Sequence, residues 1–216
     1  MKNNNKIFLG EFIASCFLVM VIVGSGIMAE NLTNDNAVRL LANTIATGAG
    51  LFVLITSFAN ISGAHLNPFV SLSMYLTKRI KGKELLTYIP AQILGCLLGV
   101  MLANFFFDHE IIELSTKERD GFNIILSEII ATFGLILIIF LTIKDGKIIL
   151  AACVGSYISA GYWFTSSTSF ANPAVAIART FTDSFTGIYY LNTPYYIIAE
   201  LIGAIMAVYI AKKLIK

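Results

Sequence analysis

The sequence predicts an all-α membrane protein with six transmembrane helices and two shorter re-entrant half-helices, arranged as an inverted repeat of three plus three spans. Three observations lead to this fold class. Of the 216 residues, 57% are apolar and only 13% are charged, which is too little charge to cover a soluble domain of this length. Six stretches are mainly apolar over about the 20 residues that a helix needs to cross a bilayer. Two Asn-Pro pairs stand at matching places in two similar halves of the chain.

The six predicted spans use most of the chain, so we expect one transmembrane domain over residues 1–216 and no separate soluble domain. The spans are residues 7–28, 39–60, 84–107, 122–143, 147–166 and 194–212. The first of them could be mistaken for a signal peptide. It is long for one and contains Glu11, so we expect a retained helix.

The distribution of lysine and arginine predicts that both termini are cytoplasmic, in a protein of the plasma membrane. With the N-terminus inside, 11 of the 15 basic residues lie on the cytoplasmic side, as the positive-inside rule requires. These are Lys2, Lys6, Lys78, Arg79, Lys81, Lys83, Lys144, Lys147, Lys212, Lys213 and Lys216. The basic residues therefore orient the chain in the bilayer, and no nucleic-acid partner is predicted. Cys16, Cys96 and Cys153 fall within predicted spans and are expected to be small buried residues, with no disulfide, metal or cofactor.

The chain repeats itself, with internal repeats at about 7–107 and 122–212. LGEFIAS at 9–15 matches LSEIIAT at 126–132, and YIPAQILG at 88–95 matches YYIIAELIG at 195–203. The second match places Gln92 opposite Glu200, for which we assign no role. Because each half has an odd number of spans, the second half must be inverted relative to the first. Inverted repeats commonly form their site near the bilayer midplane, where the halves meet.

Each Asn-Pro pair predicts the start of a half-helix. The segments are AHLNPFVSLS at 64–73 and FANPAVAIAR at 170–179. Asparagine caps the free N–H groups of a helix, and proline is tolerated in the first turn. Non-helical backbone at membrane depth is tolerated only where protein encloses it or it lines a water-filled cavity. Asn67-Pro68 and Asn172-Pro173 are therefore predicted to form the centre of a pore.

These motifs resemble those of the major intrinsic proteins, the aquaporins and aquaglyceroporins. GEFIAS, SGAHLNP, the AQ of the third span, SEIIAT and FANPA together cover essentially the whole chain. The resemblance implies a homotetramer in the lipid bilayer with one pore per protomer. It also implies that Glu11 and Glu128 accept hydrogen bonds from the re-entrant loops, and that backbone carbonyls form an acceptor ladder. The ladder would comprise Gly63, Ala64, His65, Leu66, Thr168, Ser169, Phe170 and Ala171.

The half-helices give the pore centre an electrostatic function. Both point their positive N-termini at it, and the side chains of Asn67 and Asn172 can donate to a solute oxygen. This arrangement opposes cations and interrupts proton transfer along a file of water. His65 is expected to be a buried, hydrogen-bonded loop residue, with a pH gate as the alternative. Phe69, which stands where the family usually has alanine, either packs behind the half-helices or narrows the pore.

Selectivity in the family is set by a ring of four positions, which spacing from the asparagines assigns to Thr47, Ala160, Ser169 and Val175. Relatives place aromatic residues and an arginine there, so this ring is expected to be wider and less charged. The prediction is a passive channel for small uncharged solutes and some water. The solute classes are glycerol-like polyols, urea and neutral metalloid acids such as arsenous acid, the last because some bacterial members linked to arsenic resistance share the NPAV motif. Arg179, one turn beyond Val175, is either a displaced positive charge at the outer vestibule or a solvated residue at the helix end.

Two other functions remain open: a water-selective channel and an ion-coupled secondary transporter. The transporter is disfavoured because the sequence places no acidic residue or histidine beside either Asn-Pro pair to bind a coupling ion. An enzyme is not predicted, because His65 and His109 show no spacing typical of a catalytic or metal site.

Overall fold

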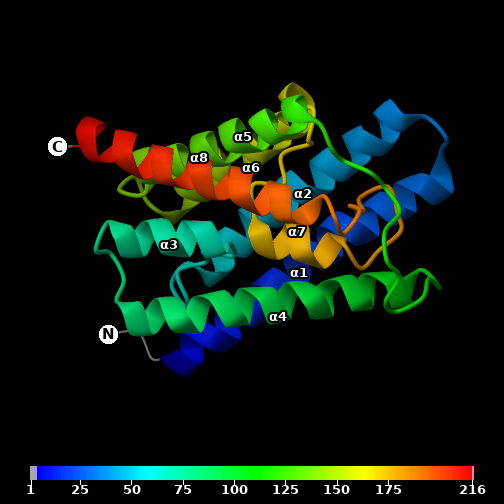
Figure 1. Ribbon diagram of the computed structural model, residues 1–216. Helices are drawn as coiled ribbons and strands as arrows, with labels where there is room; N and C mark the ends of the chain where they lie inside the picture. Colours follow the sequence, from blue (N-terminus) through cyan, green and yellow to red (C-terminus); the bar gives the residue numbers. More distant parts are fainter. Residues whose placement is uncertain (1–3, 216) are drawn as a thin grey trace.

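A computed structural model describes residues 4–215, so Lys2 and Lys216 of the predicted cytoplasmic set lie outside the described residues. Within this part the chain forms eight helices (Figure 1). They are α1 (Asn4–Leu32), α2 (Asn36–Phe58), α3 (Pro68–Leu76), α4 (Gly82–Phe106), α5 (Phe122–Thr142), α6 (Lys147–Phe164), α7 (Pro173–Arg179) and α8 (Thr193–Leu214). The short helices α3 and α7 begin at the two prolines, as predicted.

The long helices correspond to the six predicted spans. Within residues 4–215, five helices are long and apolar enough to cross a membrane by length and composition, namely α1, α2, α4, α5 and α6. The predicted span 194–212 corresponds to α8, which is 22 residues long, is not among those five and packs along α5. Large apolar side chains are exposed on the long helices, among them Ile45, Leu86 and Phe122. Such a surface is suited to lipid.

The two halves pack as a symmetric pair. α1 packs against α4 and α2, α5 packs against α8 and α6, and α2 meets α6 across the halves. Figure 1 shows the half-helices α3 and α7 in the middle of the molecule, between the long helices. Each half-helix contacts both α4 and α8, so the two Asn-Pro motifs are enclosed by both repeats.

Two glycines let the paired long helices approach closely. A Cβ on Gly95 of α4 would lie 2.3 Å from the Phe12 carbonyl oxygen, and a Cβ on Gly203 of α8 would lie 2.3 Å from the Ile129 carbonyl oxygen. Real atoms cannot approach so closely, so each glycine is required by the backbone opposite. Of the three cysteines, Cys16 and Cys96 are buried as predicted, whereas Cys153 is only half-buried on α6.

Candidate pore

The pore asparagines cap the two half-helices in the same way. The Asn67 side-chain oxygen accepts hydrogen bonds from Phe69 N at 2.8 Å and Val70 N at 3.4 Å. The Asn172 side-chain oxygen accepts from Ala174 N at 3.1 Å and Val175 N at 3.4 Å. With the oxygen engaged, each amide presents its N–H groups away from its own helix.

The same amides also join the two halves, which the sequence analysis did not anticipate. Asn67 Nδ2 donates to the Ala171 carbonyl oxygen at 2.6 Å, and Asn172 Nδ2 donates to the Leu66 carbonyl oxygen at 2.8 Å. A carboxamide has two N–H donors. One donor of each asparagine therefore holds the opposite loop, and the other remains for a solute.

The loops before the asparagines are bent by residues in the left-handed region. Ala64 and Leu66 have φ of 50° and 53°, and Thr168, Ser169 and Ala171 have φ of 64°, 51° and 46°. This conformation costs a non-glycine residue on the order of 1–3 kcal/mol. Something outside the loops must therefore hold them.

Glu11 holds the first loop. Its carboxylate accepts from Ser62 Oγ at 2.6 Å, His65 N at 3.1 Å, Leu66 N at 2.7 Å and Gln92 Nε2 at 2.7 Å. The side chain is fully buried. These four donors compensate for removing the carboxylate from water. The geometry is that of the structural role which the resemblance implies.

Glu128 and Glu200 hold the second loop together. Glu128 accepts from Phe170 N at 2.9 Å and Ala171 N at 2.8 Å, and Glu200 accepts from Asn172 N at 3.0 Å. The expectation that no acidic residue lies beside an Asn-Pro pair is thus wrong in three dimensions. It considered neighbours along the chain only, whereas α8 brings Glu200 to the second pair. The described residues that line the cavity do not include any of these glutamates.

A central cavity runs along the asparagines and has two chemically different sides. One side is formed by the loops, where Gly63, Ala64, His65, Leu66, Ser169, Phe170 and Ala171 line it together with Asn67 and Asn172. The other side is apolar and comes from four long helices. Its residues are Leu18, Ile22, Leu51, Ile55, Leu135, Ile139, Ile143, Leu150, Val154 and Ile158. Thr168, a predicted ladder residue, is not among the described lining residues.

The predicted selectivity ring needs one correction. Thr47, Ser169 and Val175 line the cavity, but Ala160 lies on an exposed face of α6. The assumed spacing was two residues too long, and two residues turn a helix by about 200°. Tyr162 takes the position instead, and its Oη lies 3.1 Å from Thr47 Oγ1. An aromatic residue therefore lines the cavity beside Thr47, which the prediction did not include.

Arg179 belongs to the cavity wall. It is 2% exposed, which contradicts the alternative of a solvated arginine at the helix end. Its Nε donates to the Thr186 carbonyl oxygen, and its guanidinium lies 3.5 Å over the Phe170 ring. A positive charge thus lines the cavity at the end of α7, although Val175 occupies the usual arginine position.

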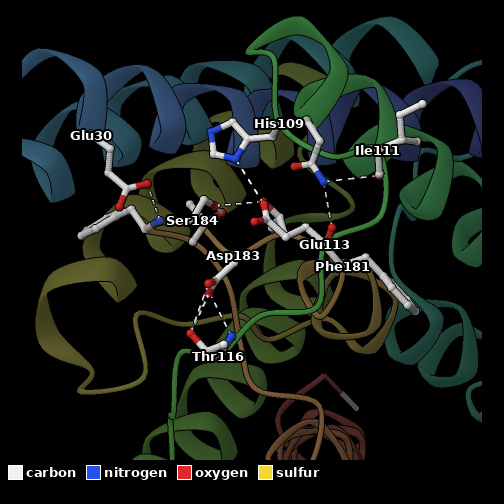
Figure 2. A network of polar contacts seen from close by, with 12 residues as sticks. Glu30, His109, Ile111, Glu113, Thr116, Phe181, Asp183 and Ser184 are labelled. Carbon is white, nitrogen blue, oxygen red and sulfur yellow. Dashed lines mark hydrogen bonds and ion pairs between the residues drawn. The ribbon is translucent and has the colours of Figure 1, made fainter.

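The segment after α7 is tied to the loop between α4 and α5, and Figure 2 shows this network. The Asp183 carboxylate accepts from Thr116 N at 2.9 Å and from its hydroxyl at 3.1 Å. Asn104 Nδ2 donates to the Phe181 carbonyl oxygen at 2.8 Å, and Phe185 N donates to Glu30 at 2.7 Å. The carbonyl that anchors Arg179 is therefore itself held in place.

Two further basic side chains lie near Arg179. Lys117 Nζ donates to the Phe185 carbonyl oxygen at 2.5 Å, and Arg119 lies 5.2 Å over the Phe170 ring, which also contacts Arg179. Desolvation, followed by the repulsion of Arg119 and Arg179, lowers the pKa of Lys117 to about 8. The sequence placed these charges outside the membrane but could not show that they converge.

His65 and Phe69 have defined places. His65 lines the cavity, its Nδ1 lies 3.0 Å from Ser71 Oγ, and its ring stacks on Tyr88 with centroids 4.2 Å apart. This geometry favours the hydrogen-bonded loop histidine over a gate. Phe69 packs against the main hydrophobic core and is not among the described lining residues.

Comparison with known proteins decides the family. The sequence pattern of the family described as MIP, Major intrinsic protein, matches residues 1–168. The chain belongs to the major intrinsic protein family. It is 46% identical over 208 residues to the aquaglyceroporin AqpS of Rhizobium meliloti (strain 1021), covering 96% of this chain and 89% of that one. It is 33% identical over 218 residues to the aquaporin TIP1-2 of Musa acuminata, covering 94% and 83%.

The fold of this major intrinsic protein is also that of a solved relative. The X-ray structure of the aquaglyceroporin from Plasmodium falciparum superimposes with a TM-score of 0.76, covering 97% of this chain and 95% of the other at 19% identity. The predicted fold class is confirmed. A major intrinsic protein is a membrane channel, so this multi-pass protein is not an enzyme.

Proposed function

We propose that this major intrinsic protein is a passive channel for small uncharged solutes larger than water, with some permeability to water. The observation that carries the proposal is the two-sided cavity. Along one side run the asparagines and the loop backbone, and along the other runs a mainly apolar wall from α1, α2, α5 and α6, in which Thr47 and Tyr162 are the polar members. A polyol has hydroxyls for the first side and carbon–hydrogen groups for the second.

The outer ring supports a solute larger than water. Thr47, Ser169 and Val175 are small, and Tyr162 is the one aromatic residue among the ring positions. Arg179 supplies a positive charge that opposes cations on the same path.

Glycerol-like polyols and urea are the solute classes that we favour. The aquaglyceroporin at 46% identity supports this choice. Neutral metalloid acids such as arsenous acid are a further class, supported by the Asn-Pro-Ala-Val motif at 172–175. We further propose one channel domain over residues 1–216, a homotetramer and a place in the plasma membrane. The family resemblance and the positive-inside distribution of charge support these proposals.

Stopped-flow light scattering on proteoliposomes tests the solute class by comparing water, glycerol, urea and arsenite side by side. We expect the protein to raise the flux of glycerol and urea as well as water. Water flux alone would support a water-selective channel and refute the proposal. Repeating the glycerol measurement with and without a proton or sodium gradient tests whether the protein is an ion-coupled transporter. A passive channel shows the same flux under both conditions.

A further inference from the structure

The internal repeat places two different side chains at one structural position. In the first half, Gln92 Nε2 donates to the Glu11 carboxylate at 2.7 Å. In the second half the counterpart of Glu11 is Glu128, and the counterpart of Gln92 is Glu200. The neutral donor of the first half is thus replaced by a second carboxyl group.

The two carboxyl groups of the second half are in direct contact. Glu128 and Glu200 bind consecutive backbone amides, those of Ala171 at 2.8 Å and Asn172 at 3.0 Å, and their side chains are in hydrogen-bonding contact. Both are fully buried. The second oxygen of Glu200, Oε2, meets no N–H or O–H donor among the described residues.

Two arginines act on this pair from a distance but form no ion pair with it. The groups that face the pair are Tyr196 of α8, Tyr157 of α6, Arg179 of α7 and Arg119 of the loop between α4 and α5. Both arginines lie over the Phe170 ring, and within residues 4–215 neither forms an ion pair with a carboxylate. The one titratable side chain of α3, Tyr75, is exposed.

Two carboxylates that share a buried site cannot both stay ionised, because their repulsion is strong where water is excluded. One proton between them removes the repulsion and provides the missing donor. Glu128 already accepts two amide hydrogens, so it is the better place for the negative charge. The proton then belongs on Glu200, where it faces the Glu128 carboxylate as the Gln92 amide faces Glu11.

We propose that Glu200 is protonated at neutral pH and donates a hydrogen bond to Glu128, as a positioning residue for the pore residue Asn172. Glu200 would then hold the Asn172 backbone by its carbonyl oxygen and Glu128 by its hydroxyl. An amide at this position can make both bonds, whereas alanine can make neither. The flux part of the test below rests on the proposed channel function, but the spectroscopic part does not.

The experiment compares the wild-type protein with Glu200→Gln, Glu200→Ala and the mirror variant Gln92→Glu, each reconstituted in vesicles. Infrared spectroscopy detects the C=O stretching band of a protonated carboxylic acid, and stopped-flow scattering measures glycerol flux. At neutral pH the wild type should show the band. Glu200→Gln should lose it while keeping the flux and the unfolding temperature. Glu200→Ala should lose the band, unfold roughly 5 °C lower and conduct less.

The mirror variant supplies the matched control. Gln92→Glu builds the same pair in the first half, so it should gain protonated-carboxyl intensity. A wild type without the band at neutral pH, a band that persists in Glu200→Gln, or a Glu200→Gln protein as impaired as Glu200→Ala would each overturn the proposal. If neither the wild type nor any of the three variants conducted glycerol, the proposed solute class would be wrong. The spectra would still decide whether Glu200 is protonated.

Discussion

Replacing Glu11 with alanine tests what holds the first re-entrant loop. The change removes the acceptor of four hydrogen bonds, from Ser62 Oγ, His65 N, Leu66 N and Gln92 Nε2. The Ser62 hydroxyl can rotate to another acceptor, but the two backbone N–H groups and the amide are directed at the lost carboxylate. Two backbone N–H groups and one N–H of the Gln92 amide are therefore left without a partner, while the Gln92 nitrogen still donates to Ser71 Oγ at 3.0 Å.

The size of the effect follows from that count. A buried donor left unsatisfied costs about 1–3 kcal/mol, so three of them destabilise the fold by about 3–9 kcal/mol. The total stability of a protein is about 5–15 kcal/mol. Since about 1 kcal/mol shifts the unfolding temperature of a chain of this size by about 2–4 °C, even the low estimate predicts a decrease of about 6–12 °C.

The assay is thermal unfolding of the purified protein in detergent, followed by circular dichroism, together with glycerol flux in proteoliposomes. Glu110→Ala is the control, because it removes the same charge from an exposed residue of the loop between α4 and α5. Glu11→Gln keeps one acceptor oxygen and should fall between the two. If Glu11→Ala unfolded at the same temperature as Glu110→Ala and conducted glycerol as fast as the wild type, the carboxylate would not be what holds the loop.

Four further predictions concern other parts of the molecule. Arg179→Gln should raise the leak of sodium or potassium through proteoliposomes, whereas Arg179→Lys, which keeps the charge, should not. Tyr162→Ala should raise glycerol and urea flux relative to water by opening the outer ring, and an unchanged ratio would place the constriction elsewhere. Burial and neighbouring positive charge lower the folded-state pKa of Lys117 from 10.5 to about 8. Between these two pH values the unfolded chain therefore binds more protons than the folded protein. Stability should therefore rise with pH from about 8 to about 10.5, a slope that Lys117→Met should reduce in unfolding temperatures measured across this range. Gly203→Val should lower the yield of folded protein, because its side chain would collide with the Ile129 carbonyl of α5; unchanged yield and stability would contradict the close contact.

The fold followed from local patterns that the sequence displays directly. Runs of apolar residues set the long helices, and each Asn-Pro pair marked the start of a half-helix to the residue, because capping depends on neighbours along the chain. The repeat showed that Glu11 and Glu128 occupy matching positions in the two halves, and the resemblance to the major intrinsic proteins implied their contact with the loops.

The outer ring was less predictable, because it depends on helix rotation. Because the assumed spacing was wrong by two residues, the prediction named Ala160, which is exposed, and missed Tyr162, which lines the cavity. The stripe Leu150, Val154, Ile158 and Tyr162 on α6 recurs every four residues, and this signal could have found the tyrosine. Nothing in the sequence showed that Arg179 would be buried, because its place depends on a carbonyl of the loop that follows it.

By itself the sequence determined that this chain crosses the membrane as two inverted halves with an asparagine at the start of each half-helix. It did so because hydropathy and helix capping are properties of short segments. Only the tertiary structure decided how the halves are joined, with each asparagine bound to the opposite loop and Glu200 brought to Asn172. These contacts span up to 106 residues, and no local pattern encodes them because they exist only once the helices have packed.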